Sequence, residues 1–186
     1  MVSIGAILTF LGQGFLYPED KKFLKKGSTA LAGLAHDLGI SIPFLEEEPD
    51  LAAHQSEFVK LFIASPQGVS APPYGSYYIN SRKLLFQEGT EQVLSYYEKA
   101  GLHPPDGPEP PDHLAFELFL AGYMADKGFE ALLQDFLSHH LLIWYPQFEK
   151  KLFEASPSNW FKALGLVTEE LLKQLSSMEG GSYEKA

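Results

Sequence analysis

The chain has 186 residues, of which 45% are hydrophobic and 13% aromatic. This length and composition suffice for one domain with a sizeable core, and they argue against a disordered chain. Cysteine is absent, which excludes disulfides, thiolate metal sites and a cysteine nucleophile. The net charge of −10 argues against nucleic acid as the main partner, because phosphate binding calls for a basic surface. Acidity then either attracts basic peptides or serves solubility alone.

The stretch from Met1 to Leu16 is apolar, with no basic residue before it and no small-residue cleavage site after it. We interpret it as a buried first helix, over about residues 2–16, and not as a signal peptide. It is too short to span a membrane, and no other segment is long enough. No direct membrane insertion is therefore expected.

Apolar residues recur with a helical period along the chain, and no alternating strand pattern stands out. A second helix is expected over about residues 19–38, ended by Gly39, and Asp50 is expected to cap a third. Inward-facing candidates in these two helices are Phe23, Leu31, Leu34, Leu38, Leu51, Phe58, Leu61 and Phe62. A loop rich in proline and glycine is expected over 65–78. A fourth helix follows over about 89–100, with an earlier start near Ser81 left open, and Gly101 ends it.

Five prolines stiffen residues 103–111, and Asp112 then opens a helix that is apolar on nearly all sides. Such a helix is typical of the centre of a fold. Another helix is expected after Gly128, with an apolar face of Phe129, Leu132, Leu133, Phe136, Leu137, His140, Leu141 and Trp144. Pro146 is expected to end or kink it.

A last helix spans about 158–178, and the tail 179–186 is expected to be flexible. The sequence therefore predicts one all-α domain over residues 1–186, a multi-helix bundle of about seven or more helices. Two long, stiff loops join them, and loops of that length in a compact domain are often functional.

The most informative motif is Glu109-Pro110-Pro111-Asp112-His113, which leads into the apolar helix. Asp112 can accept hydrogen bonds from the free N–H groups of the helix start. His113 and Glu117 are four residues apart and so share a face. This pattern fits a binding site, but it also fits an ordinary helix start with Asp112 as cap, a solvated His113 and a Glu117 paired with it.

Two further motifs each allow two interpretations. His140 and Trp144 are also four residues apart, and with Phe136 they form either part of a groove or an aromatic core stripe with a satisfied histidine. Residues 71–78 contain Tyr74, Ser76, Tyr77 and a third tyrosine between prolines and Ser81. These side chains can form an aromatic, hydrogen-bonding lip, or they can fold back onto the core.

Together these motifs resemble the TorD/DmsD/NarJ superfamily of molybdoenzyme-maturation chaperones. The resemblance rests on Glu57–Phe62, on Ala71-Pro72-Pro73-Tyr74-Gly75-Ser76-Tyr77, on Glu109–His113, and on Phe136-Leu137 followed by His140, Leu141, Leu142 and Trp144. The four stand in the same order and at the same spacing over about residues 50–150. The two clearest departures are Gly75, where many relatives carry an acidic residue, and the adjacent His139 and His140, of which only His140 fits.

The resemblance implies an all-α, cytoplasmic protein that binds the N-terminal, often twin-arginine, leader of a molybdopterin-containing oxidoreductase. The partners are then this leader and the catalytic subunit that carries it, held until the cofactor has been inserted. The leader-binding residues it implies are Tyr74, Ser76, Tyr77, Glu109, Pro110, Asp112 and His113, with Glu117, Phe136, His140 and Trp144 as support of the groove or core. It also points, less specifically, to guanine-nucleotide binding. The sequence leaves the oligomeric state open.

Physically, guanidinium groups of a leader match carboxylates such as Glu109 and Asp112, and its apolar part fits a groove as a helix. No catalytic or metal-binding residue is expected under this interpretation. The first alternative is a metal-dependent hydrolase using His113 and Glu117, with His139 or His140 as third ligand. Against it, the sequence has no HExxH pattern, phosphate loop or nucleophile elbow. The second alternative is a general helical adaptor for protein interactions.

Overall fold

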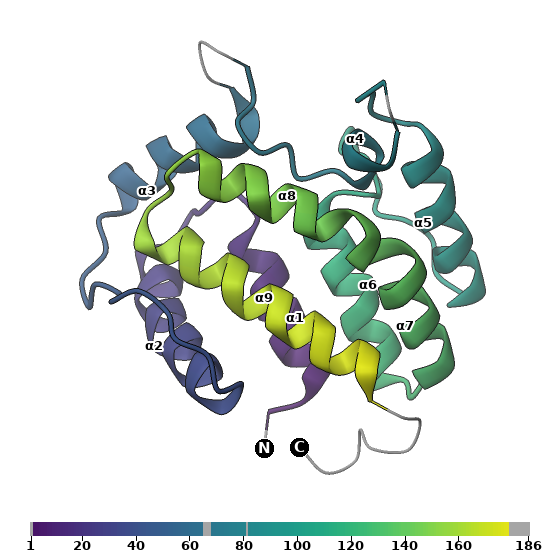
Figure 1. Ribbon diagram of the computed structural model, residues 1–186, viewed down its shortest axis with the longest axis horizontal. Helices are drawn as coiled ribbons and strands as arrows, with labels where there is room; N and C mark the ends of the chain where they lie inside the picture. Colours follow the sequence, from purple (N-terminus) through teal and green to yellow (C-terminus); the bar gives the residue numbers. More distant parts are fainter. Residues whose placement is uncertain (1, 65–67, 81, 179–186) are drawn as a thin grey trace. The chain divides into compact units, whose positions relative to one another are not determined.

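Regular structure is helical wherever the computed structural model describes the chain, in residues 2–64, 68–80 and 82–178 (Figure 1). The prediction of an all-α fold is thereby confirmed. The elements are α1 (Ile4–Gly14), α2 (Lys21–Asp37), α3 (Leu51–Phe58), the π-helical η1 (Val59–Ile63), α4 (Gly75–Ile79), α5 (Glu88–Lys99), α6 (Leu114–Asp126), α7 (Glu130–Phe136), the π-helical η2 (Leu137–Leu141), α8 (Leu142–Glu154) and α9 (Asn159–Ser177). The predicted tail 179–186, the start of the 65–78 loop and Ser81 lie outside the described residues.

Contacts divide the chain into two units, each assembled from segments that are far apart in the sequence. Of the described residues, unit 1 contains those up to Phe15, those from Pro73 to Pro146 and those from Leu172 onward. Unit 2 contains Leu16–Pro72 and Gln147–Leu171. The single domain expected from the sequence stays a prediction.

Unit 1 is built around α6, which packs along α1. Ten of the thirteen residues of α6 are apolar, and most of its circumference is buried, as the sequence predicts for a central helix; the side formed by Phe116, Phe119 and Tyr123 is half-buried. The two backbones approach closely: a Cβ at Gly12 would lie 2.9 Å from the Ala115 carbonyl oxygen, and one at Gly122 2.9 Å from that of Gly5. Only glycine fits at such contacts.

Unit 2 contains an aromatic core formed by α3, η1, α8 and α9. The ring centroid of Phe62 lies 4.9 Å from that of Phe58, 5.4 Å from Phe161 and 6.2 Å from Phe148. His54 stacks on Phe161 with centroids 4.5 Å apart. The predicted inward positions Phe58, Leu61 and Phe62 are thus confirmed, and all three side chains are buried.

Local signals predict most helix ends correctly. Asp50 caps α3 as expected, accepting hydrogen bonds from the N–H groups of Ala52 at 2.9 Å and Ala53 at 3.3 Å. Gly39 and Gly101 adopt positive φ just after α2 and α5, as helix-ending glycines do. In α2, Leu31 is buried, whereas Phe23, Leu34 and Leu38 are only half-buried.

Three local predictions are wrong or incomplete. The loop expected to continue to residue 78 contains the short helix α4, and Phe129, expected on a buried face, is exposed. Helical structure also continues through Pro146 to Glu154, so the helix does not end at this proline. The ψ of Leu142 is −9°, far from the usual −42°, which rotates the carbonyl four residues before the proline and relieves the expected clash.

None of the helices in the described part of the chain combines the length and the apolar character that crossing a bilayer requires.

Candidate functional site

The two motif-bearing segments of unit 1 lie side by side and are joined through their backbones. The Gly75 N–H donates to the Asp112 carbonyl at 3.0 Å, and the Leu114 N–H donates to the Pro73 carbonyl at 2.8 Å. Tyr74 and His113 form an isolated antiparallel bridge between these bonds. Segments 36 or more residues apart in the sequence are therefore fixed against each other, and they bring the predicted site residues together.

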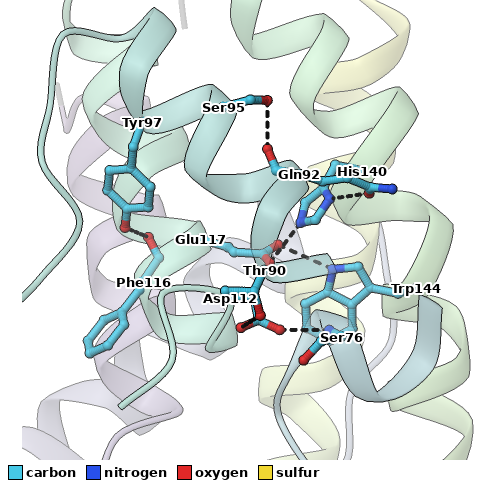
Figure 2. A network of polar contacts seen from close by, with 10 residues as sticks. All are labelled: Ser76, Thr90, Gln92, Ser95, Tyr97, Asp112, Phe116, Glu117, His140 and Trp144. Atoms are coloured by element: carbon cyan, nitrogen blue, oxygen red, sulfur yellow. Dashed lines mark hydrogen bonds and ion pairs between the residues drawn. The ribbon is translucent and has the colours of Figure 1, made fainter. Parts of the chain in front are cut away.

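The buried side chain of Asp112 connects the two segments through hydrogen bonds. Its side chain is fully buried, with one carboxylate oxygen accepting from the Ser76 N–H at 2.6 Å and the other from the Thr90 hydroxyl at 2.8 Å (Figure 2). It thereby ties the start of α4 and the start of α5 to the approach of α6. Its expected role as cap of α6 is wrong, because both of its oxygens are used in these long-range contacts.

His113 caps α6 in place of Asp112. Its Nδ1 accepts a hydrogen bond from the Ala115 N–H at 3.1 Å, and its ring meets the Tyr74 ring edge-on with centroids 5.2 Å apart. Burial lowers the pKa of His113 to about 4, so the imidazole is neutral near pH 7 and can accept. The expected solvated His113 is therefore also wrong, since only 5% of it is exposed.

Glu117 is the centre of a second buried network. Its carboxylate contacts His140 Nε2 at 2.8 Å and accepts from the Trp144 indole N–H at 3.2 Å, and all three side chains are fully buried (Figure 2). The other ring nitrogen of His140 lies 3.1 Å from the Gln92 side-chain oxygen. Glu117 is thus paired with His140 and not, as one interpretation had it, with His113.

The interpretation of the Phe136–Trp144 stripe as core with a satisfied histidine is confirmed. Phe136 stacks on His140 with ring centroids 5.4 Å apart. Tyr78 stacks on Trp144 with centroids 5.7 Å apart. Tyr78 therefore folds back onto the core and buries its hydroxyl, although its side chain as a whole is half-exposed, like those of Tyr74 and Tyr77. The tyrosine segment thus realises both of the alternatives that the sequence left open.

The buried Glu117–His140 pair holds a proton more tightly than the two separate groups would in water. Burial raises the pKa of Glu117. Burial alone would lower the pKa of His140, but the adjacent Glu117 carboxylate outweighs it, so the pKa of His140 is raised above 6.5. Two such closely coupled groups titrate as a pair. The folded protein therefore keeps a proton here that the unfolded chain loses as pH rises above about 6.5.

We expect the free energy of unfolding to fall as pH rises above about 6.5, by up to about 1.4 kcal/mol per pH unit. A histidine with a raised folded pKa stabilises below its unfolded pKa, and this contribution is lost as pH rises through the folded pKa. Glu117→Gln should remove the alkaline fall. Urea unfolding at pH 6.5, 7.5 and 8.5 measures the free energy of unfolding of the unmodified and the Glu117→Gln proteins. If it falls equally steeply with pH in both, the Glu117–His140 pair does not hold the extra proton.

Below pH 6.5, two other histidines have the opposite effect. Burial lowers the pKa of His54 and of His113 to about 4, so the free energy of unfolding falls as pH drops.

The surface part of the site is small. The Tyr74 hydroxyl donates to the Glu109 carboxylate, and Glu109 is exposed. Burial, followed by the Glu109 contact, raises the pKa of Tyr74, so its hydroxyl stays a donor at neutral pH. Of the seven residues expected to bind a leader, only Tyr74, Tyr77 and Glu109 are accessible to a ligand. The other four, Ser76, Pro110, Asp112 and His113, are buried and position them.

Sequence reasoning missed two residues of these networks, Thr90 and Gln92 of α5. Both lie in a helix that the sequence predicts, but no local pattern connects them to Asp112 or His140. Gly75 is also part of the interior: a Cβ there would lie 3.0 Å from the Trp144 indole nitrogen and 3.1 Å from a Glu117 oxygen. Such contacts between distant segments have no signal in one sequence.

The geometry does not support the metal-hydrolase alternative. Both oxygens of Glu117 are engaged by His140 and Trp144, and His113 Nδ1 caps its own helix. Across residues 2–64, 68–80 and 82–178, no group of three or more His, Cys, Asp or Glu side chains is placed to hold a metal ion.

Known proteins share both sequence and fold with this chain. It is 28% identical over 116 residues to the Tat proofreading chaperone DmsD of Salmonella typhi, a match covering 62% of this chain and 56% of the relative. It is 32% identical over 136 residues to chaperone protein TorD of a Psychrobacter species, covering 67% and 59%. In both, the match spans less than two thirds of the relative. A crystal structure from Archaeoglobus fulgidus, provisionally described as a redox enzyme maturation protein, is 27% identical with a TM-score of 0.60, covering 92% of this chain and 93% of that one.

A family model described as the nitrate reductase delta subunit matches residues 20–150, well over half of the chain. This range contains all the motifs on which the resemblance was based. The chain therefore belongs to the nitrate reductase delta subunit family, within the TorD/DmsD/NarJ superfamily that its motifs resemble.

Proposed function

We propose that this chain is a cytoplasmic chaperone for the maturation of a redox enzyme, and not itself an enzyme. It binds the arginine-bearing N-terminal leader of a molybdopterin oxidoreductase and holds this catalytic subunit until its cofactor is inserted. The chaperone names of its relatives DmsD and TorD support this proposal. So does the redox-enzyme maturation protein that shares its fold.

The observation that carries the proposal is the exposed Glu109 carboxylate beside two buried networks. Tyr74 donates to one carboxylate, which has lone pairs left for further donors. Glu109 has no Lys, Arg or His partner within the described residues. A guanidinium group matches the fork geometry of such a carboxylate. The half-exposed rings of Tyr74 and Tyr77 then offer flat, partly apolar surface beside the charge.

The buried residues have a different role in this proposal. Asp112 and His113 are positioning residues, because their polar atoms bond to Ser76, Thr90 and Ala115 and not to solvent. Replacing either of them changes leader binding through the backbone of the 73–79 segment. Glu109, by contrast, touches the ligand directly, so its replacement leaves the fold intact.

We expect Glu109→Gln to weaken binding of a twin-arginine leader about tenfold, or about 1.4 kcal/mol. A glutamine keeps the size and the bond to Tyr74 but gives up the charge-assisted bonds, which are roughly twice as strong as neutral ones. Calorimetry with a synthetic twin-arginine leader peptide measures the change. Glu98→Gln, the same substitution at an exposed position of α5, is the matched control.

Equal affinities of the Glu109→Gln and Glu98→Gln proteins would contradict the site. A second peptide in which both arginines are replaced by alanine tests the function itself. A leader chaperone should bind this peptide much more weakly than the original. If it binds both peptides equally well, the general helical adaptor is the better account.

A further inference from the structure

Unit 2 contains two adjoining cavities that the proposed leader site does not use. The first has a volume of about 320 Å³ and lies among α2, α3, the start of α9 and the 44–50 segment. The second, of about 510 Å³, lies between α2 and residues 42–47. They share Ser28, Phe44, Leu45 and Glu46 as walls. The shared walls make them one groove with two compartments, in the size range of ligand-binding sites.

The first compartment is acidic and lacks a compensating cation. Its walls include the carboxylates of Glu46, Asp50 and Glu57. The only titratable base in the wall is His54, whose pKa burial lowers to about 4, so it is neutral at pH 7. Asp50 caps α3 and Glu57 accepts from the Ser158 N–H at 2.5 Å, but Glu46 is exposed and forms no ion pair within the described residues.

The second compartment is also acidic. Lys25 is the one basic residue in its wall and is already paired with Glu48, so it does not balance the carboxylates of Glu47 and the shared Glu46. The charge of the groove is thus unbalanced around Glu46, where the two compartments meet. A positively charged side chain is the ligand group that this arrangement attracts.

Two aromatic residues also line the first compartment. Phe44 is 79% exposed, an unusual degree for a large apolar side chain, and its carbonyl is fixed by the Asn159 side chain at 3.0 Å. Trp160 is only 7% exposed, yet its indole N–H finds no acceptor within the described residues. A buried donor without an acceptor is costly.

These features together point to a polypeptide as occupant: the geometry assigns this groove to a segment of another protein in which basic and apolar residues alternate. The basic side chain lies against Glu46, and the apolar side chains lie against Phe44 and Trp160. This second docking site goes beyond the proposed leader site, with which it shares no residue.

Fluorescence and calorimetric titration with the peptide acetyl-Leu-Lys-Leu-Lys-Leu-amide tests the proposal. Lysine is used because it lacks the guanidinium fork that suits Glu109, and the titration is repeated in the Glu109→Gln protein. Binding should change the emission of Trp160 and weaken at high salt. The same peptide with glutamate in place of lysine should not bind.

Two variants locate the site. Glu46→Lys reverses the unpaired charge and should weaken binding at least tenfold, whereas Glu98→Lys, the same change at an exposed position of α5, should not. Ala53→Phe places a bulky side chain at an exposed wall position of the first compartment and should also weaken binding at least tenfold. Circular dichroism confirms that each variant is folded.

The proposal is overturned if the lysine peptide does not bind, if the glutamate peptide binds equally well, or if Glu46→Lys behaves like Glu98→Lys. Loss of lysine-peptide binding in the Glu109→Gln protein would also overturn it, since the peptide would then occupy the leader site. The two proposals are tested independently, because the twin-arginine peptide tests the site at Glu109 and the lysine peptide tests the groove at Glu46. If the twin-arginine peptide does not bind at Glu109, the result with the lysine peptide still stands.

Discussion

Glu117→Ala is expected to lower the free energy of unfolding by about 3–5 kcal/mol, the usual cost of removing one partner of a buried ion pair. The substitution leaves the His140 imidazole and the Trp144 indole N–H without their buried partner. It also leaves a cavity beside Gly75, whose missing side chain cannot fill it. Urea unfolding followed by circular dichroism measures the change.

Glu98→Ala is the matched control, because Glu98 is exposed and its loss should change stability by no more than about 0.5 kcal/mol. Glu117→Gln should fall between the two, since an amide keeps an acceptor for one of the two donors but not the charge. A loss below 1 kcal/mol in Glu117→Ala would mean that water or a shifted side chain replaces the carboxylate. The network would then not be what fixes the site.

The fold was predictable because its signals are local. The all-round apolar character of α6 placed it at the centre, Asp50 marked the start of α3, and Gly39 and Gly101 marked helix ends. Each of these features depends on residues a few positions apart. Periodicity and capping chemistry read from one sequence are sufficient for such features.

The cap of α6 shows where that reasoning fails. Asp112 and His113 both have side chains that can accept from a helix start, and aspartate is the more common cap. The choice was decided by Ser76 and Thr90, which are 36 and 22 residues away and occupy both oxygens of Asp112. The cap of α6, and with it the start of the helix, therefore lies one residue later than expected. The π-helical segments η1 and η2 likewise had no recognisable sequence signal.

The structure gives Gly75 a different role from the one that the family resemblance suggested. By that resemblance, Gly75 marks the loss of an acidic contact to a client arginine. In the structure its Cβ position lies inside the protein, against Trp144 and Glu117. An acidic side chain there would meet the Glu117 carboxylate before it met a client. In this chain Glu109 is therefore the better candidate for the arginine contact.

Gly89→Ala is expected to cost about 3 kcal/mol, the upper range for overpacking a well-packed interior. A Cβ at Gly89 would lie 2.6 Å from the Ser76 nitrogen and 2.7 Å from its Cα. These are backbone atoms, so no side chain can rotate away. The start of α5 must move, and the Thr90–Asp112 and Ser76–Asp112 bonds loosen with it.

Gly33→Ala provides the control for the same chemical change. Gly33 lies inside α2 with nothing within 4 Å of its Cβ position, and alanine in a helix interior should raise stability by about 0.4–1 kcal/mol. If urea unfolding shows that Gly89→Ala lowers the free energy of unfolding while Gly33→Ala raises it, the loss in Gly89→Ala comes from packing and not from helix propensity. Leader affinity, measured where both variants are folded, should fall only in Gly89→Ala, because only that change displaces the segment that carries Tyr74. If Gly89→Ala unfolds like the unmodified protein, α4 and α5 are not held in close contact, and the buried network cannot be what positions the leader site.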